Sequence, residues 1–216
     1  MQAPTPRTQV HRHPERGAYD REEIGRVLDE ALLCTVAWVD EDGRPRALPT
    51  IQARIGDVLY LHGSRAARAW KAVAAGAEIC VVAVIVDGLV LARTSPHHSM
   101  NYRSAIVYGR GREVVDPDEL SSAATAITRH VLPGRETDAA PPREKDWRET
   151  LILALPIEEA SAKIRIGPPL DDAADLDLGV WAGVLPLHTV AGTPQAAPDL
   201  RPGIPEPSYL QGFRRP

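Results

Sequence analysis

Short runs of β-branched and apolar residues, separated by turn signals, are the feature that most constrains the fold of this chain. Strands are predicted over residues 34–39, 46–54, 58–62, 78–86, 89–94, 105–108, 151–155 and 162–166. Asp42-Gly43 and Asp87-Gly88 are hairpin signals, and we expect residues 34–62 to form an antiparallel meander with Pro49 interrupting its second strand. Six to eight short, mostly antiparallel strands at regular spacing predict a mainly β fold that closes as a barrel.

Peripheral helices are predicted where apolar residues recur at helical spacing behind a capping residue. Asp20 caps a helix that runs to about residue 32, and Asp116 caps a second one that runs to about Val131. We expect a surface loop over residues 135–146 and a short helical turn over residues 157–160.

Changes of composition divide the chain into three parts. Residues 1–18 are polar and predict a mobile arm, and residues 19–167 form the barrel domain. Residues 168–216 are rich in Pro, Asp and Gly around an apolar island at Trp181. We expect this extended tail to pack across the barrel or across a dimer partner.

Charge and hydropathy restrict the classes of partner. The net charge of −4 gives no electrostatic reason to expect nucleic acid or an anionic membrane. The sequence has no apolar run that could span a bilayer, and its N-terminal residues lack the apolar centre of a signal peptide, so we expect a cytoplasmic protein. Cys34 and Cys80 lie in apolar runs and are interpreted as reduced core residues.

The stretch Asp57–Glu78 predicts a phosphate site. An apolar strand gives way at Gly63-Ser64 to a segment of helical composition, and a helix start offers backbone N–H groups and the positive end of a dipole. Arg65, Arg68 and Lys71 are spaced to share one helical face. The alternative is that these cations form an ordinary solvated face.

Three histidines are candidates for proton transfer, because their ordinary pKa lies near neutrality. His62 ends a predicted strand, and His97 and His98 follow Pro96 in a predicted turn. The alternatives are a structural or phosphate-contacting role for His62 and a solvated or interface turn for the pair. The pair is adjacent rather than at helical spacing, and there is no Cys-x-x-Cys, so we predict no metal site.

A set of short motifs, in this order, resembles one family. They are Asp42-Gly43-Arg44-Pro45, Leu48-Pro49-Thr50, Tyr60-Leu61-His62-Gly63-Ser64, Asn101-Tyr102-Arg103-Ser104, Lys163-Ile164-Arg165-Ile166-Gly167-Pro168-Pro169 and Trp181-Ala182-Gly183-Val184-Leu185-Pro186. The sequence resembles flavin-nucleotide-binding proteins related to pyridoxamine 5′-phosphate oxidase, nearest the branch of the nitroimidazole-resistance reductases.

The resemblance implies a split β-barrel homodimer with FMN bound at sites between the subunits. The cofactor-binding residues that it implies are Pro49, Thr50, Leu61, His62, Gly63, Ser64, Arg65, Arg68, Lys71, Tyr102, Arg103, Ser104 and Trp181. His62 is also the candidate catalytic residue. Heme-binding and deazaflavin-binding relatives exist in this family, so these cofactors stay open beside FMN.

Two functional hypotheses follow from the resemblance. The first is an FMN-dependent oxidoreductase that passes electrons from NAD(P)H to a small acceptor such as a nitroaromatic or a quinone. The second is a non-catalytic flavin or heme binding protein that acts as a carrier or sensor. We do not expect a vitamin B6 substrate, because the tail lacks a second basic set that matches the substrate-phosphate site of the oxidases.

Overall fold

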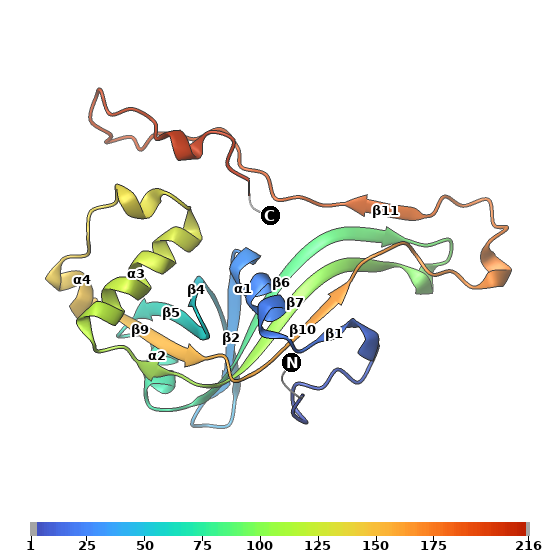
Figure 1. Cartoon of the computed structure of the whole chain (residues 1–216), viewed down its shortest axis with the longest axis horizontal. Helices are drawn as coiled ribbons and strands as arrows, with labels where there is room; N and C mark the ends of the chain where they lie inside the picture. The colour runs from blue at the N-terminus through green and yellow to red at the C-terminus, as the bar shows by residue number, and fades with distance from the viewer. Residues whose placement is uncertain (1–3, 215–216) are drawn as a thin grey trace.

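Antiparallel strand pairing arranges the chain into two sheets in the computed structural model, which describes residues 4–214 (Figure 1). Sheet A contains β1 (Gly17–Ala18), β2 (Cys34–Val39), β3 (Pro45–Thr50), β6 (Glu78–Leu91), β7 (Ser99–Arg110), β10 (Glu159–Arg165) and β11 (Gly183–Pro186). Its order is β1-β10-β7-β6-β2-β3, with β11 on β6. Sheet B contains β4 (Gln52–Ile55), β5 (Val58–Ser64), β8 (Arg112–Glu113) and β9 (Thr150–Pro156), in the order β4-β5-β9-β8.

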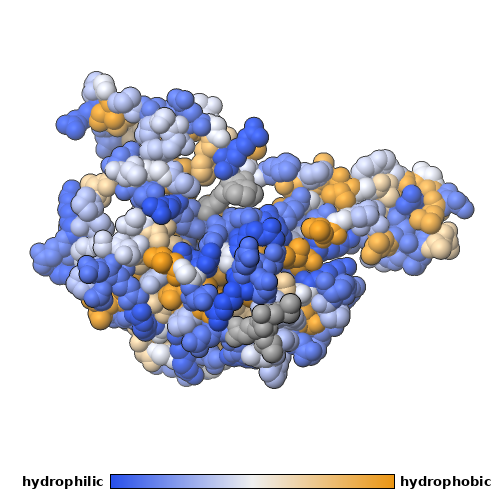
Figure 2. All heavy atoms as spheres, in the orientation of Figure 1, coloured by the Kyte–Doolittle hydropathy of each residue, from blue (hydrophilic) through white to orange (hydrophobic). Residues whose placement is uncertain are grey.

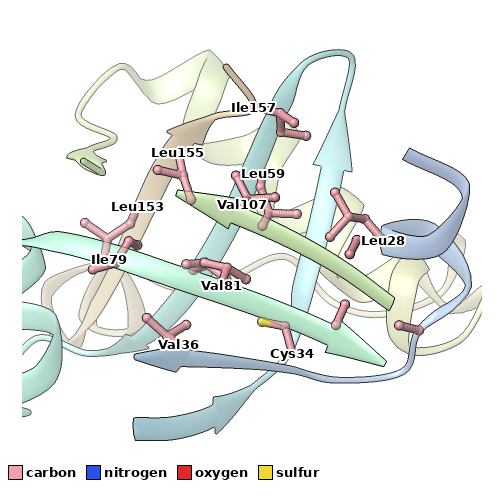
Figure 3. Packing of buried hydrophobic residues seen from close by; sticks show 14 of the residues in the cluster. Leu28, Cys34, Val36, Leu59, Ile79, Val81, Val107, Leu153, Leu155 and Ile157 are labelled. Carbon is pink, nitrogen blue, oxygen red and sulfur yellow. The ribbon is translucent and has the colours of Figure 1, made fainter. Parts of the chain in front are cut away.

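One hydrophobic core fills the space between the sheets (Figure 3). Val36, Val81 and Val107 come from sheet A, and Leu59 and Leu153 come from sheet B. The sheets do not merge into one closed barrel but face each other as two halves, which confirms the predicted mainly β, split-barrel fold. The described residues contain eleven strands, more than the six to eight predicted. The short strands β1, β8 and β11 were not predicted.

Both cysteines are free thiols, as predicted. Cys34 is 2 % exposed in the core, and burial raises the pKa of its thiol to about 12. Cys80 is half-buried on β6, where burial also raises the thiol pKa.

In the described part of the chain, four α-helices surround the sheets: α1 (Arg21–Glu30), α2 (Arg68–Ala74), α3 (Pro117–Val131) and α4 (Glu144–Glu149). The predicted caps are confirmed, since the carboxylates of Asp20 and Asp116 accept hydrogen bonds from the N–H groups three residues later, at 3.0 and 2.9 Å. Helix α3 covers sheet B through a second apolar cluster that includes Tyr60 and Ile127. None of the helices described within residues 4–214 is long and apolar enough to cross a membrane.

The predicted strand over residues 46–54 is two strands in different sheets. The break lies at Ile51 rather than at Pro49, because the chain crosses there from β3 in sheet A to β4 in sheet B. Gln52 is fully buried at the crossing and donates hydrogen bonds to the carbonyls of Leu28 and Ala31 at the end of α1. The expected three-stranded meander is therefore wrong.

The predicted hairpin at Asp87-Gly88 is also wrong. Strand β6 continues through these residues with a bulge between Val86 and Gly88, and the chain turns only at the 3₁₀ turn Ser95–His97. The guanidinium of Arg103 on β7 donates hydrogen bonds of 2.7 and 2.9 Å to the two carboxylate oxygens of Asp87. Asp87 therefore lies in a β-bulge and not in a turn. As a result β6 and β7 form a long arm that projects from the body (Figure 1).

The remaining connections differ in detail from the predictions. Residues 157–160 form no helix, because the buried Ile157 anchors a tight link into β10. The expected loop over residues 135–146 contains the 3₁₀ turn Arg135–Thr137 and the start of α4. Further 3₁₀ turns lie at Pro14–Arg16, Ala173–Asp175 and Ser208–Leu210.

The two ends of the chain lie against the body. In the predicted arm, whose residues 1–3 fall outside the described part, Thr8 is buried and β1 pairs with β10. The tail runs back along the β6–β7 arm, where β11 pairs with Gly88–Leu91 (Figure 1). Residues 215–216 of the predicted tail lie outside the described residues.

Candidate functional site

Strand β5 sends its side chains alternately to the two faces of sheet B. Leu59 and Leu61 are fully buried in the core between the sheets, and Tyr60 packs in the cluster under α3. His62 and Ser64 share the outer face with Tyr60. Leu61, which the resemblance places among the cofactor residues, therefore has its side chain in the core, whereas His62 lies on an accessible face.

The cations after β5 do not share one helical face, so that prediction is wrong. Pairing with β9 carries β5 on to Ser64, opposite Thr150, and α2 begins only at Arg68. Arg65 lies before the helix, where its guanidinium pairs with Glu113 at 2.7 Å. Arg68 and Lys71 are exposed on α2 and have no ion-pair partner among residues 4–214. Two of the three predicted cations are thus available for an anion.

Thr50 and Pro49 lie at an edge of sheet A that faces the end of β5. Within the described residues β3 pairs only with β2, so one side of its backbone is open. The hydroxyl of Thr50 donates a long hydrogen bond of 3.4 Å to the carbonyl of His62. The fold therefore brings the predicted residues of β3 and β5 together, from two different sheets.

A cavity of about 530 Å³ lies between the outer face of sheet B and the helices α3 and α4. Its apolar wall includes Ile127, Trp147 and Ile152, and His62 reaches it from β5. Arg143 and Lys145 are exposed residues that line it near solvent. Sequence reasoning missed the α4 side of this cavity, although a Trp in a polar stretch was a signal that the segment packs on the body.

The imidazole of His62 has an unusual environment. Burial lowers its pKa, which favours the neutral ring. Nδ1 is buried and has no hydrogen-bond partner among the described residues, so the ring can use only Nε2 toward the cavity. A neutral imidazole with an open nitrogen can carry a proton or bind a metal.

A larger cavity of about 870 Å³ lies between α1, α3, β4 and the C-terminal residues. Several of its charged side chains are already paired with one another or with neighbours: Arg54 with Asp29, Glu30 with Arg103, and Arg129 with Glu136. Because these charges are satisfied within the chain, we place the candidate site at His62 instead.

The other predicted cofactor residues lie away from this site. On β7, Tyr102 and Ser104 pair with Val86 and Val84 and share the outer face of sheet A with them, whereas Arg103 is held by Asp87 and Glu30. Trp181 lies in the tail with 68 % of its surface exposed. These residues form no common site with His62 within one chain.

His97 and His98 lie at the tip of the β6–β7 arm. His98 Nδ1 is 3.0 Å from the carbonyl of Thr94. Potential ligand atoms of His97, Asp172 and Asp175 lie within 4.8 Å of one another, a grouping across the tail that sequence spacing did not indicate.

The comparisons with known proteins point to one family. A model described as pyridoxamine 5′-phosphate oxidase matches residues 20–164. The flavocytochrome Anf3 from Azotobacter vinelandii is 34% identical, with 99% of each chain covered and a TM-score of 0.90. An FAD and heme binding protein from Mycobacterium smegmatis is 37% identical over 93% of this chain and 98% of that chain, with a TM-score of 0.86.

A more distant structure agrees in fold. A putative 5-nitroimidazole antibiotic resistance protein from Bacteroides thetaiotaomicron is 22% identical over 68% of this chain and 86% of that chain, with a TM-score of 0.58. No protein with a curated function matches the chain.

Proposed function

Because the chain belongs to the pyridoxamine 5′-phosphate oxidase family, we propose that it is a flavin-binding oxidoreductase whose cofactor lies at the end of β5. The observation that carries this proposal is that β5 leads to two unpaired cations on α2, Arg68 and Lys71, and meets the open edge of β3 at its own end, where Thr50 contacts the carbonyl of His62. A flavin nucleotide is anionic at its phosphate and flat and largely apolar at its ring, so it needs cations at one end and backbone or hydroxyl donors at the other.

The residues of the chain have separate roles in this proposal. Arg68 and Lys71 neutralise the phosphate, and the open backbone of β3 with the Thr50 hydroxyl binds the polar edge of the ring. A bound flavin would supply the redox chemistry, which is hydride uptake from a reduced nicotinamide and electron transfer to a small acceptor such as a nitroaromatic or a quinone. His62 lines the neighbouring cavity under α3 and α4 and is not one of these flavin contacts.

The identity of the flavin nucleotide is open between FMN and FAD. The family resemblance implies FMN, whereas the relative from Mycobacterium smegmatis is an FAD and heme binding protein. Titration of the purified full-length chain with each nucleotide, followed by flavin fluorescence, distinguishes them. We expect Arg68→Ala with Lys71→Ala to weaken binding roughly a hundredfold, about tenfold for each cation.

A matched control removes cations of a similar kind elsewhere. Arg44→Ala with Arg201→Ala changes the net charge equally at exposed positions outside the end of β5 and α2, and should leave flavin affinity unchanged. Equal affinity of both double variants would contradict the proposed phosphate site. Bleaching of bound flavin by NAD(P)H under anaerobic conditions tests the oxidoreductase, and flavin that stays oxidised would favour the carrier or sensor.

Heme binding is a second candidate function with its own support. The two relatives described above, which match nearly the whole chain, are a flavocytochrome and an FAD and heme binding protein. We therefore propose that the chain binds a heme in addition to the flavin. An absorption spectrum of the purified protein, with and without added hemin, tests this function independently of flavin binding.

We further propose that the protein is a homodimer with the flavin between the subunits. The exposed side chains of Val84, Val86 and Met100 lie on the β6–β7 arm, and Figure 2 shows apolar side chains gathered along it. Tyr102 and Ser104 share this face with the two valines and so reach a partner if the face is an interface. Light scattering of the full chain and of Val84→Glu tests it: a monomeric wild type would contradict the interface.

A further inference from the structure

The cavity beside His62 differs from the flavin site in position and in chemistry. It lies between sheet B and the helices α3 and α4, whereas Arg68 and Lys71 lie on α2. Its volume of about 530 Å³ falls in the range of small-molecule pockets, which is roughly 300–1,000 Å³. Ile127, Trp147 and Ile152 give it an apolar wall that suits a flat hydrophobic ring system.

His62 provides the one metal-ligand nitrogen that reaches this cavity among the described residues that line it. Its Nδ1 is buried without a partner, so Nε2 is the nitrogen left for the cavity. The ring therefore has one nitrogen free for a metal, as in metal-binding histidines. A flavin contains no metal and would leave this nitrogen without a comparable role.

Two exposed cations mark the solvent side of the cavity. Arg143 and Lys145 line it at the start of α4 and make no side-chain ion pair among residues 4–214. Asp146 is the acidic residue that also lines it, and its carboxylate is held at 2.8 Å by the N–H of Arg143. If a flat apolar ring with carboxylates at one edge bound with its ring against the apolar wall, its carboxylates could pair with Arg143 and Lys145 at the solvent side.

We propose that this cavity binds heme, with Nε2 of His62 as an axial ligand of the iron and with Arg143 and Lys145 pairing with the propionates. The inference rests on the proposed heme function and assigns it a site. It also places the heme on the same strand, β5, that leads to the flavin phosphate site, so that the two cofactors lie on adjacent parts of the chain.

The test distinguishes the contribution of the iron ligand His62 from that of the cavity itself. Hemin is titrated into the full-length protein and followed by its Soret absorption, beside metal-free protoporphyrin IX, which needs the cavity but no ligand. His62→Ala should change the Soret band and weaken hemin binding at least tenfold, leave protoporphyrin binding within about twofold, and regain the wild-type band on addition of imidazole.

Two control variants replace a histidine by alanine at the tip of the β6–β7 arm. His97→Ala and His98→Ala should keep the wild-type hemin spectrum, since neither residue lines the cavity. Reversal of charge in Arg143→Glu with Lys145→Glu should weaken hemin and protoporphyrin binding alike, by roughly tenfold or more.

The outcomes that overturn the assignment are distinct from failure of the heme function itself. An unchanged hemin spectrum in His62→Ala, or its loss in His97→Ala, would overturn the site while heme binding stands. Absence of hemin binding by the wild type would overturn both. Flavin titration and circular dichroism of each variant show that it is folded, because the proposed flavin contacts do not need the His62 ring.

Discussion

Gly63 packs directly against the indole ring of Trp70: a Cβ at position 63 would lie 1.6 Å from Nε1 of that ring. No residue with a side chain therefore fits at this position of β5. Trp70 is only 3 % exposed and belongs to the main core. Gly63, which the sequence suggests as part of a phosphate site, is therefore required for the packing of Trp70 against β5.

Gly63→Ala should accordingly destabilise the protein by about 1–3 kcal/mol or more, because the methyl group forces Trp70 out of its position. Urea unfolding followed by Trp fluorescence measures the change. Gly179→Ala is the matched control, since no atom lies within 4 Å of the Cβ that it adds. Equal free energies of unfolding for the two variants would contradict this account of Gly63.

The amide of Gln52 joins the crossing between the sheets to the end of α1, and its replacement should be costly. Gln52→Leu removes the hydrogen bonds donated at 3.1 and 2.7 Å to the carbonyls of Leu28 and Ala31. We expect a loss of about 2–3 kcal/mol in the free energy of unfolding.

Gln52→Glu should cost more than Gln52→Leu, because it removes the same donors and introduces a carboxylate at a fully buried position. Chemical unfolding of both variants measures this order, with the exposed Gln211→Leu as control. A more stable Glu variant would show that the amide N–H groups are not what position 52 requires.

Local signals in the sequence predicted the elements whose ends are decided locally. The Asp20 and Asp116 caps, the apolar runs of the core strands and the buried thiol of Cys34 follow from residue type and spacing. The crossing at Gln52 was not predictable in this way, because it is decided by a contact with α1 some twenty residues earlier in the chain.

The errors at the candidate site have a similar cause. Asp87-Gly88 has the composition of a turn, but Arg103 on the neighbouring strand and β11 on the other side keep the strand running. The expectation that Arg65, Arg68 and Lys71 share one helical face was wrong, because pairing with β9 extended β5 and separated Arg65 from the helix. The cavity beside His62 needs residues of α3 and α4, which no local pattern connects to β5.

Arg103 joins the bulge of β6 to α1 and should be sensitive to a conservative change. Its guanidinium donates to both oxygens of Asp87 and also contacts the carboxylate of Glu30, and these three side chains are 16, 29 and 19 % exposed. Lys cannot provide the forked donors, so Arg103→Lys should lose about 1–2 kcal/mol and Arg103→Ala about 2–3 kcal/mol. Thermal unfolding, with the exposed Arg44→Ala as control, decides whether the ion pairs matter to this extent.

The thiol of Cys34 should be inert in the folded protein at neutral and mildly alkaline pH. Burial raises its pKa to about 12, so the reactive thiolate is scarce and the sulfur is also sterically covered. Labelling with a maleimide at pH 8, read by mass spectrometry of peptides, should modify Cys34 only after denaturation, and Cys80 is the internal comparison. Rapid native labelling of Cys34 would mean that the strand opens readily.

Glu119 makes the stability of the α3 cap region depend on pH. Its carboxylate accepts hydrogen bonds from Arg112 at 2.7 and 3.0 Å and from the hydroxyl of Tyr60 at 2.9 Å, and these donors hold its pKa below the ordinary value of 4.5. A depressed pKa in the folded state means that the interaction stabilises the protein above the pKa of the unfolded chain and is lost as the pH falls through the folded pKa.

Glu119→Gln should therefore be less stable than the wild type by about 1 kcal/mol at pH 7, a modest value because Arg112 is largely exposed. The difference should stay constant down to about pH 5 and shrink as the pH drops below 4.5. Urea unfolding at pH 7, 5 and 4 measures it, with the exposed Glu206→Gln as the control. A difference that grows toward low pH would have the wrong sign for a stabilising carboxylate and would exclude this role for Glu119.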